Sequence, residues 1–179
     1  VFGDIGCYTL GALPPFKALA SCVDMGASIT MAKGAADAGL FPSVAVIGDS
    51  TFIHSGITGL IDIVYNKGAN TVIILDNSIT GMTGHQDNPT TGKTIRGEAT
   101  KQVDLEKLCY AIGVEHVVIA DPFDVKNFEK VVKEEVEREE PSVIIAQRPC
   151  ALLKTVKYAG NCFINDQCRN CKMCMKLGC

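Results

Sequence analysis

The sequence predicts an α/β fold in which a parallel β-sheet is flanked by helices. Hydrophobic residues make up 47% of the 179-residue chain and aromatic residues only 6%, a composition typical of domains rich in small and aliphatic side chains. Short apolar segments alternate with longer stretches of helical periodicity, and this alternation indicates parallel strands joined by helices. A chain of this size can bury a hydrophobic core of its own.

The strand segments are short, rich in β-branched residues and almost continuously apolar, as expected for strands that are covered on both faces. They comprise residues 43–47, 70–75, 114–119 and 142–146. The helix segments comprise residues 28–38, 55–66, 105–112 and 123–140. The last helix follows Asp121-Pro122 and contains the charged run KEEVEREE, which we interpret as a solvent-exposed face.

Two further segments, residues 76–100 and 147–166, have no strand or helix periodicity. The first is dense in Gly, Thr, Asn and Asp, and loops of this length in a compact domain are usually functional or disordered. We therefore expect a globular domain over residues 1–150, followed by a linker and a cysteine-rich tail over residues 151–179.

Composition and charge exclude several classes of function. The formal net charge is −3 and no basic stripe is present, so a nucleic-acid partner is not expected. No apolar stretch approaches the length needed to cross a membrane. The nine cysteines are divided between scattered positions and the tail, which favours free thiols in a reducing cytoplasm over a secreted disulfide scaffold. Since the chain begins at Val1 and stops at Cys179, we expect a fragment of a longer subunit.

The tail carries cysteines at a tight spacing, in the run CRNCKMCMKLGC: Cys168, Cys171, Cys174 and Cys179. Three thiolates spaced three residues apart can bind one iron–sulfur cluster from a short loop, whereas disulfides between such close neighbours are strained. The run approaches the bacterial ferredoxin pattern C-x2-C-x2-C-x3-C-P, with one extra residue before the last cysteine. The tail is therefore predicted to be a ferredoxin-like 4Fe-4S segment.

Polar residues follow two of the predicted strands where each strand ends. The segment GDST (48–51) follows one strand, and DNSI (76–79) follows the next one along the chain. In a parallel sheet both segments lie at the carboxyl edge, where open α/β sheets bind ligands. Asp49 and Asn77 can therefore be neighbours, and their oxygen donors suit Mg²⁺, which could hold a diphosphate against the amides that open the helix near Ser55. The alternative is a helix-capping Asp and an Asn in a turn.

This arrangement resembles the thiamine-diphosphate signature G-D-[GS]…N. The resemblance implies that Asp49, Asn77 and the carbonyl group of Ile79 bind Mg²⁺. GDIGCY (3–8) resembles the loop that passes the diphosphate, and DMGAS (24–28) resembles the segment against the aminopyrimidine. Met25 would then be the apolar wedge that bends the cofactor, whereas the alternative is a methionine in the core. The other cofactor-binding residues implied by the resemblance are Gly6, Cys7, Gly26, Gly48, Ser50, Thr51 and Gly81.

The segment TGMTGHQDNPTTGK resembles the cofactor loop of the 2-oxoacid:ferredoxin oxidoreductases, with His85 in place of the second glycine of the usual T-G-G-Q form. Together with GDIGCYTLGALPPF, GDSTFIHSGITGL and LDNSITGMTGHQDNP, it resembles the large subunits of the indolepyruvate:ferredoxin oxidoreductases, in which a ferredoxin-like module follows the thiamine-diphosphate domain. The resemblance implies a thiamine-diphosphate-binding fold and oxidative decarboxylation of aryl 2-oxoacids. Coenzyme A would take up the acyl group, and 4Fe-4S clusters would pass the two electrons to ferredoxin.

The resemblance also implies partners. The glutamate that activates the aminopyrimidine would belong to an amino-terminal half of the same subunit, so this chain alone is expected to be inactive. A smaller second subunit, ferredoxin and an oligomeric assembly are expected. Two alternatives stay open: the cofactor subunit of a pyruvate or 2-oxoglutarate ferredoxin oxidoreductase, and a non-catalytic electron-transfer scaffold.

Histidine titrates near neutral pH, so each histidine is a candidate for proton transfer. We expect His85, in the long loop, to act at the site, His54 to cap or pack, and His116 to be structural. Lys93 and Arg96 in the same loop could reach a substrate carboxylate or the phosphates of coenzyme A, or simply be solvated.

Overall fold

A sheet of six parallel strands forms the centre of the computed structural model, which describes residues 1–157, 160 and 163–173. The strand order is β2-β1-β3-β4-β6-β5, and neighbouring strands pair in parallel. The strands are β1 (Phe2–Gly3), β2 (Ser21–Cys22), β3 (Ser43–Gly48), β4 (Asn70–Asp76), β5 (His116–Ala120) and β6 (Ser142–Gln147). This architecture confirms the predicted fold class.

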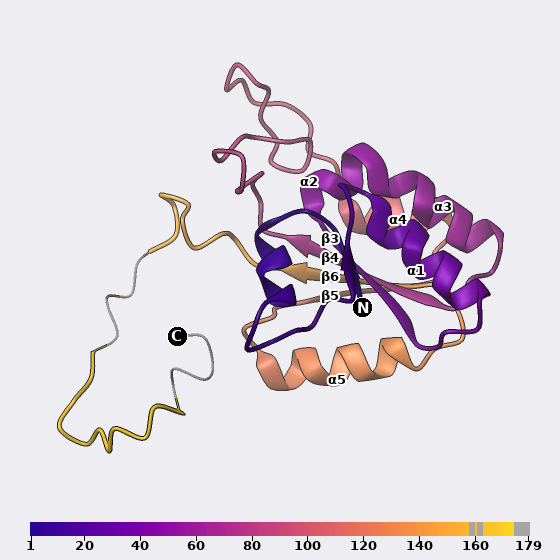
Figure 1. The fold of residues 1–179 in the computed structure, drawn as a ribbon. Helices are drawn as coiled ribbons and strands as arrows, with labels where there is room; N and C mark the ends of the chain where they lie inside the picture. The colour runs from indigo at the N-terminus through magenta and orange to yellow at the C-terminus, as the bar shows by residue number, and fades with distance from the viewer. Residues whose placement is uncertain (158–159, 161–162, 174–179) are drawn as a thin grey trace.

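Helices cover both faces of the sheet (Figure 1). One face carries α1 (Ala27–Asp37), α3 (Ile57–Tyr65) and α4 (Leu105–Ile112), and the other carries α5 (Val125–Val136). Three short elements lie near the carboxyl ends of the strands. A 3-10 helix, η1 (Cys7–Ala12), follows β1, while α2 (Asp49–Thr51) and a π-helical turn, η2 (Phe52–Gly56), lead from β3 into α3.

The hydrophobic core lies between the central strands and the helices α1, α3 and α4. Five consecutive residues of β6, from Ser142 to Ala146, are buried, which explains why this strand has no alternation of polar and apolar residues. The completely buried core side chains include Ala45 and Ile47 of β3, Val72 and Ile74 of β4, Val143 of β6, Ile29 of α1, Phe52 of η2, and Leu60 and Ile63 of α3.

The structure corrects one helix boundary that matters for the site. The helix predicted over residues 55–66 belongs to a helical run that begins six residues earlier, at Asp49, with Gly48 as the N-cap residue. The amides that open this run are therefore at residues 49–51, and the expectation that they lie near Ser55 is wrong. The side chain of Phe52 is fully buried, so packing of this residue holds the early turn in helical form despite the weak helix propensity of Gly, Asp, Ser and Thr.

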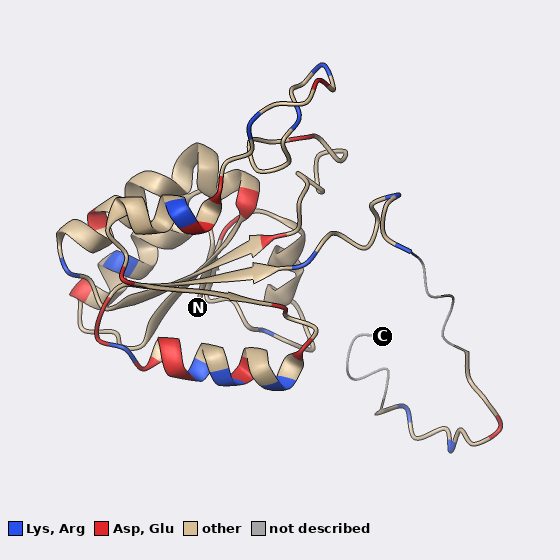
Figure 2. Ribbon diagram, turned by 180° about the vertical axis from the view of Figure 1, so that it is seen from behind, with Lys and Arg blue, Asp and Glu red and all other residues tan. Residues whose placement is uncertain are grey.

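The other helix and strand boundaries in the structure lie closer to the predicted ones. The predicted strand over residues 114–119 begins at His116, and the predicted helix over residues 123–140 is limited to α5, whose N-cap Asp124 accepts a hydrogen bond from the Asn127 amide at 3.3 Å. Charged residues line the outer side of α5 (Figure 2), as expected for a solvated face. Glu135 is the exception, because its side chain is buried and accepts a bond from Arg138 Nε at 2.9 Å.

Two irregular segments leave the sheet at its carboxyl edge (Figure 1). Residues 77–104 contain no helix and no strand of the sheet, only the isolated bridges Thr80–Gln86 and Lys93–Ala99, and they project away from the strands. The chain after β6 departs from the same edge. Among the described residues no helix is long and apolar enough to span a membrane.

Candidate functional site at the carboxyl edge of the sheet

The register of two central strands brings Asp49 and Asn77 together. β3 and β4 pair so that Gly48 lies opposite Leu75. Asp49, the first residue of α2, directly follows β3, Asp76 is the last residue of β4, and Asn77 comes immediately after it. The structure thus confirms that the GDST and DNSI segments meet at the carboxyl edge of a parallel sheet, where such sheets bind ligands.

Asp49 is a buried carboxylate, with 3% of its surface exposed. Its Oδ1 atom accepts a bond from the Ser50 amide at 2.6 Å, and the Thr90 hydroxyl lies 3.5 Å from its Oδ2 atom. Burial raises the pKa of Asp49 to about 6, the negative charge of Asp76 adds to this rise, and the amides of Ser50 and Ser78 oppose it. A buried carboxylate with so little compensating positive charge is the donor that a divalent cation stabilises.

Asn77 lies in a loop built from two successive side-chain turns. The amide of Ser78 donates to Asp76 Oδ1 and the amide of Ile79 donates to Asn77 Oδ1, both at 3.1 Å. Ser78 adopts a left-handed conformation, with φ of +61°, which Asx turns of this kind accommodate. The carbonyl oxygen of Ile79 accepts no hydrogen bond within the part of the chain that the structure describes, so it is available as a third oxygen donor beside Asp49 and Asn77.

Asp76 holds the base of this loop and was not predicted to have a role. Only 8% of its surface is exposed, and its Oδ2 atom accepts a bond from Gln147 Nε2 at 2.8 Å. Beyond β6 the pairing continues, since the Arg148 amide donates to the Asp76 carbonyl at 3.0 Å and the Cys150 amide donates to the Asn77 carbonyl at 2.9 Å. The start of the tail therefore contacts the same loop.

The long loop folds back so that Thr90 lies beside Asp49, although the sequence showed no core periodicity there. Thr90 and Asn88 are both buried, with 3% and 8% of their surfaces exposed. Asn88 Oδ1 accepts bonds from the Thr90 hydroxyl at 2.6 Å and from the Thr90 amide at 2.8 Å. The Asn-Pro-Thr-Thr turn was the signal that could have suggested an ordered segment.

The loop after β1 lies beside Gly48. Tyr8 accepts a hydrogen bond from the Gly48 amide at 3.1 Å through its phenol oxygen, and burial raises the pKa of this phenol. The Thr9 hydroxyl bonds the Asp4 carbonyl at 2.8 Å, and the same oxygen accepts the Gly6 amide at 2.9 Å. These bonds hold Gly6 and the exposed Cys7 near the start of α2.

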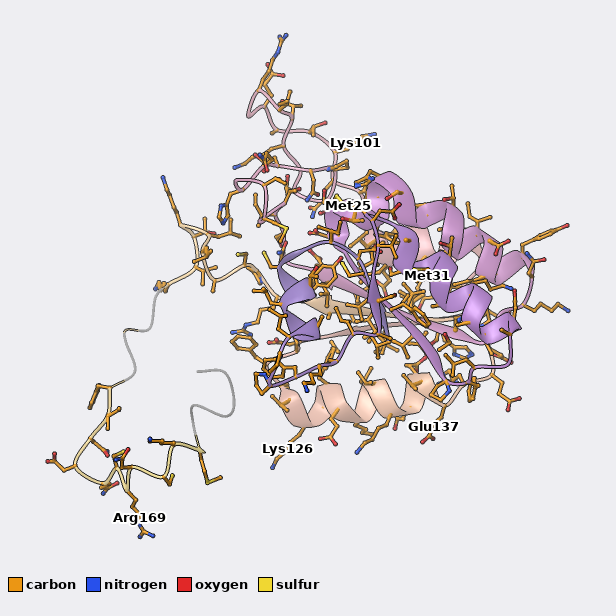
Figure 3. The ribbon with its side chains drawn as sticks, in the orientation of Figure 1. Met25, Met31, Lys101, Lys126, Glu137 and Arg169 are labelled. Atoms are coloured by element: carbon orange, nitrogen blue, oxygen red, sulfur yellow. The ribbon has the colours of Figure 1, made fainter. Side chains whose placement is uncertain are left out.

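Met25 is 40% exposed, so the alternative that it is a core methionine is wrong. It immediately precedes Gly26, the N-cap residue of α1, whose φ is +105°. In Figure 3, Met25 lies on the side of the molecule from which the long loop around Lys101 projects. Lys126 near the start of α5 and Glu137 just after its end lie at the opposite face.

Of the other predicted site residues, some lie near Asn77 and others lie exposed on the surface. His85 is exposed and left-handed, with φ of +63°, and Gly81 lies near Asn77, since a Cβ on this glycine would be 3.9 Å from Asn77 Nδ2. His54 is exposed in η2. His116 begins β5 and lies 3.1 Å from Glu140 Oε2. Lys93 and Arg96 are exposed in the projecting loop.

A cavity of about 230 Å³ lies next to the site, between the long loop and the ends of β4 and β6. Its polar lining residues are Asp76, Thr90, Gln102, Asp104, Glu106 and Gln147. Three of these carry carboxyl groups and none is basic, so the cavity does not suit an anionic ligand.

The tail can be followed only in part. Cys168 and Cys171 are exposed and form no disulfide, whereas the predicted ligands Cys174 and Cys179 lie outside the described residues. Within residues 1–157, 160 and 163–173, no three His, Cys, Asp or Glu side chains are grouped to hold a metal ion. The set formed by Asp49, Asn77 and the Ile79 carbonyl is of another kind, since an amide and a backbone oxygen complete it.

Known proteins share both the sequence and the fold. Residues 4–146 match the family described as thiamine pyrophosphate enzyme, C-terminal TPP binding domain. Over 96% of the chain, the sequence is 38% identical to the indolepyruvate oxidoreductase subunit IorA of Pyrococcus abyssi, and over 97% it is 40% identical to that of Archaeoglobus fulgidus. The chain spans 30% and 28% of the lengths of these two relatives, respectively.

Solved structures show the same fold. The 2-oxoglutarate:ferredoxin oxidoreductase from Magnetococcus marinus, with 2-oxoglutarate, coenzyme A and succinyl-CoA bound, matches 88% of the chain with a TM-score of 0.73 and 18% identity, over 55% of its own chain. A putative thiamin diphosphate-dependent enzyme from Mycobacterium smegmatis matches 82% with a TM-score of 0.57 and 17% identity, over 28% of its own chain.

Proposed function

The chain belongs to the thiamine pyrophosphate enzyme family as a C-terminal TPP-binding domain, and from this premise we propose that it forms the metal and diphosphate half of the active site of an indolepyruvate:ferredoxin oxidoreductase. The reaction is oxidative decarboxylation of an aryl 2-oxoacid with coenzyme A, with electrons passed to ferredoxin. The observation that carries the proposal is the buried Asp49 carboxylate beside Asn77 at the ends of paired parallel strands.

Asp49, Asn77 and the Ile79 carbonyl would hold Mg²⁺, since these oxygen donors match its preference. The raised pKa of Asp49 supports this role, because a cation compensates the cost of burying the charge. The Ser50 amide orients the carboxylate, and the Thr90 hydroxyl lies beside its other oxygen. The segments that carry Gly6 and Cys7, and Gly48, Ser50 and Thr51, are proposed to lie along the diphosphate, at the N-terminus of the helical run that begins with α2.

Met25 and Gly26 are proposed to lie against the aminopyrimidine, and Gly81 and His85 beside the reacting end. When bound, thiamine diphosphate supplies the carbon nucleophile and the electron sink for decarboxylation. His85 is proposed to move a proton at the substrate, because it is exposed in the loop that returns to Asp49 through Thr90. The activating glutamate would come from another part of the enzyme.

The tail is proposed to bind 4Fe-4S clusters through Cys168, Cys171, Cys174 and Cys179. Support comes from the spacing of the cysteines and from the bonds that fix Arg148 and Cys150 to the loop of Asp76 and Asn77, since the tail then departs from the cofactor edge. Such clusters fit a reducing cytoplasm. The partners would be the rest of the same subunit, a second smaller subunit and ferredoxin, in an oligomeric assembly.

The substrate assignment rests on the names of the sequence relatives. Its test is anaerobic reduction of a viologen dye by the full-length protein and its second subunit, supplied with thiamine diphosphate, Mg²⁺ and coenzyme A. We expect indolepyruvate to be oxidised faster than pyruvate or 2-oxoglutarate. Faster turnover of either aliphatic acid would contradict the aryl assignment, and no reduction with any of them would contradict the enzymatic role.

A further inference from the structure

A single peptide group, the one between Met25 and Gly26, is held at both of its polar atoms. The Met25 carbonyl accepts a bond from the Ser55 hydroxyl at 3.0 Å. The Gly26 amide donates to Asp4 Oδ2 at 2.9 Å. Two elements far apart in the sequence, the loop after β1 and the turn η2, therefore fix the orientation of this one peptide plane.

Asp4 is suited to this task because it is completely buried and its second oxygen is also engaged. Its Oδ1 atom accepts the amide of Ser28 at 2.6 Å, so the carboxylate spans the first turn of α1. Burial raises the pKa of Asp4 while the amides of Ser28 and Gly26 lower it. Gly26, the N-cap residue, has no side chain that could accept these amides, so the Asp4 carboxylate accepts them from another segment of the chain.

The Ser55 hydroxyl lies between two possible acceptors, one in its own helix and one in the segment before α1. A serine in a helix ordinarily donates to the carbonyl four residues earlier, which here is Thr51 at 3.3 Å. The hydroxyl has one proton, and Met25 lies nearer at 3.0 Å. The π-helical turn shifts the helical phase at this point, and such turns are frequent at functional sites.

The approach of the two segments is so close that only glycine fits at position 26. A Cβ there would lie 2.5 Å from Ser55 Oγ and 3.2 Å from the Ser55 carbonyl oxygen. Met25 itself is left 40% exposed. Its backbone is thus rigidly held while its side chain is free to contact a ligand.

We propose that Asp4 and Ser55 are positioning residues that fix Met25 for contact with the aminopyrimidine end of the cofactor. The inference rests on the proposed function and deepens it, since it assigns the pyrimidine end of the site to residues other than those that hold the metal. Pre-organising one contact residue lowers the ordering cost of binding, so loss of one neutral hydrogen bond should weaken binding about three- to tenfold.

The test compares two ligands on the full-length protein, both titrated with Mg²⁺ present: thiamine diphosphate and inorganic pyrophosphate, which lacks the aminopyrimidine. Ser55→Ala should raise the Kd for thiamine diphosphate about three- to tenfold and leave the Kd for pyrophosphate unchanged. Thr58→Ala, an exposed position one turn further along, is the matched control and should change neither. An unchanged Kd for thiamine diphosphate, or an equal loss for both ligands, would overturn the inference.

A second pair of variants guards against general damage to the fold. Asp4→Asn should weaken binding of thiamine diphosphate and leave binding of pyrophosphate unchanged. Ser55→Thr, which keeps the hydroxyl, should bind thiamine diphosphate with the affinity of the wild type. A wild-type protein that binds neither ligand would refute the proposed function. A wild-type protein that binds both, without selective loss in Ser55→Ala or Asp4→Asn, would refute the inference alone.

Discussion

Gly26 and Ser55 approach each other so closely that a methyl group on Gly26 would lie 2.5 Å from the Ser55 hydroxyl oxygen. Gly26→Ala would also place a side chain at φ of +105°, a conformation that non-glycine residues rarely adopt. We expect the variant to lower the free energy of unfolding by about 1–3 kcal/mol and to weaken thiamine diphosphate binding. Urea denaturation and calorimetric titration would measure the two effects.

Gly34→Ala is the control for this substitution, since Gly34 lies within α1 and a Cβ there would meet nothing within 4 Å. Alanine favours the helix by about 0.5–1 kcal/mol, so this variant should be more stable than the wild type and bind the cofactor normally. Equal destabilisation by both substitutions would contradict the close contact between Gly26 and Ser55.

The buried charge of Asp49 should make the metal-free protein less stable at neutral pH. The pKa of Asp49 is raised from 3.8 to about 6 by burial, so the charged carboxylate destabilises the fold above about pH 6, and this cost disappears as the pH falls below about 4. In EDTA at pH 7.5, Asp49→Asn should raise the free energy of unfolding by about 1–3 kcal/mol. Urea denaturation at pH 7.5, 5.5 and 4 should show the difference shrinking, whereas a constant difference would contradict the assigned cause.

His85→Asn tests the proposed proton transfer without disturbing the backbone, because asparagine tolerates the left-handed conformation of His85. We expect kcat to fall and the Kd for thiamine diphosphate to stay the same, since the imidazole is assigned to the substrate. Steady-state kinetics would measure kcat, and calorimetric titration would measure the Kd. Turnover equal to that of the wild type would remove His85 from the mechanism.

Cys171→Ser should reduce the iron and acid-labile sulfide of anaerobically purified full-length protein, because a serine hydroxyl is a poor substitute for a thiolate ligand. Cys22→Ser is the control, as Cys22 is half-buried in β2 and far from the tail in sequence. Iron analysis and the visible absorption of the cluster would measure the loss. Unchanged iron content in Cys171→Ser would contradict the assignment of the tail.

The sequence predicted the central strands well because burial on both faces leaves a continuous apolar pattern in β3, β4 and β6. β1 and β2 were missed, since two residues each are too few to show any period. The helical start at Asp49 was missed because Gly, Asp, Ser and Thr favour caps and turns, and only the burial of Phe52 overrides this preference.

The residues of the candidate site were likewise predictable from the sequence only in part. Asp49 and Asn77 were predictable because they directly follow strands whose pairing could be inferred. Asp4, Ser55 and Thr90 were not, since their contacts join segments 22, 30 and 41 residues apart. Such contacts depend on how loops fold over the sheet edge, and no local pattern specifies them.

The assignment of Asp49 to the metal site is tested by calorimetric titration of thiamine diphosphate, with Mg²⁺ present, into the full-length protein and into its Asp49→Ala variant. The control is Asp62→Ala, an exposed carboxylate on α3. We expect Mg²⁺-dependent binding to the wild type and to the control, and none to Asp49→Ala. Binding to Asp49→Ala with wild-type affinity would contradict the metal site, and absence of binding to the wild type would contradict the proposed function.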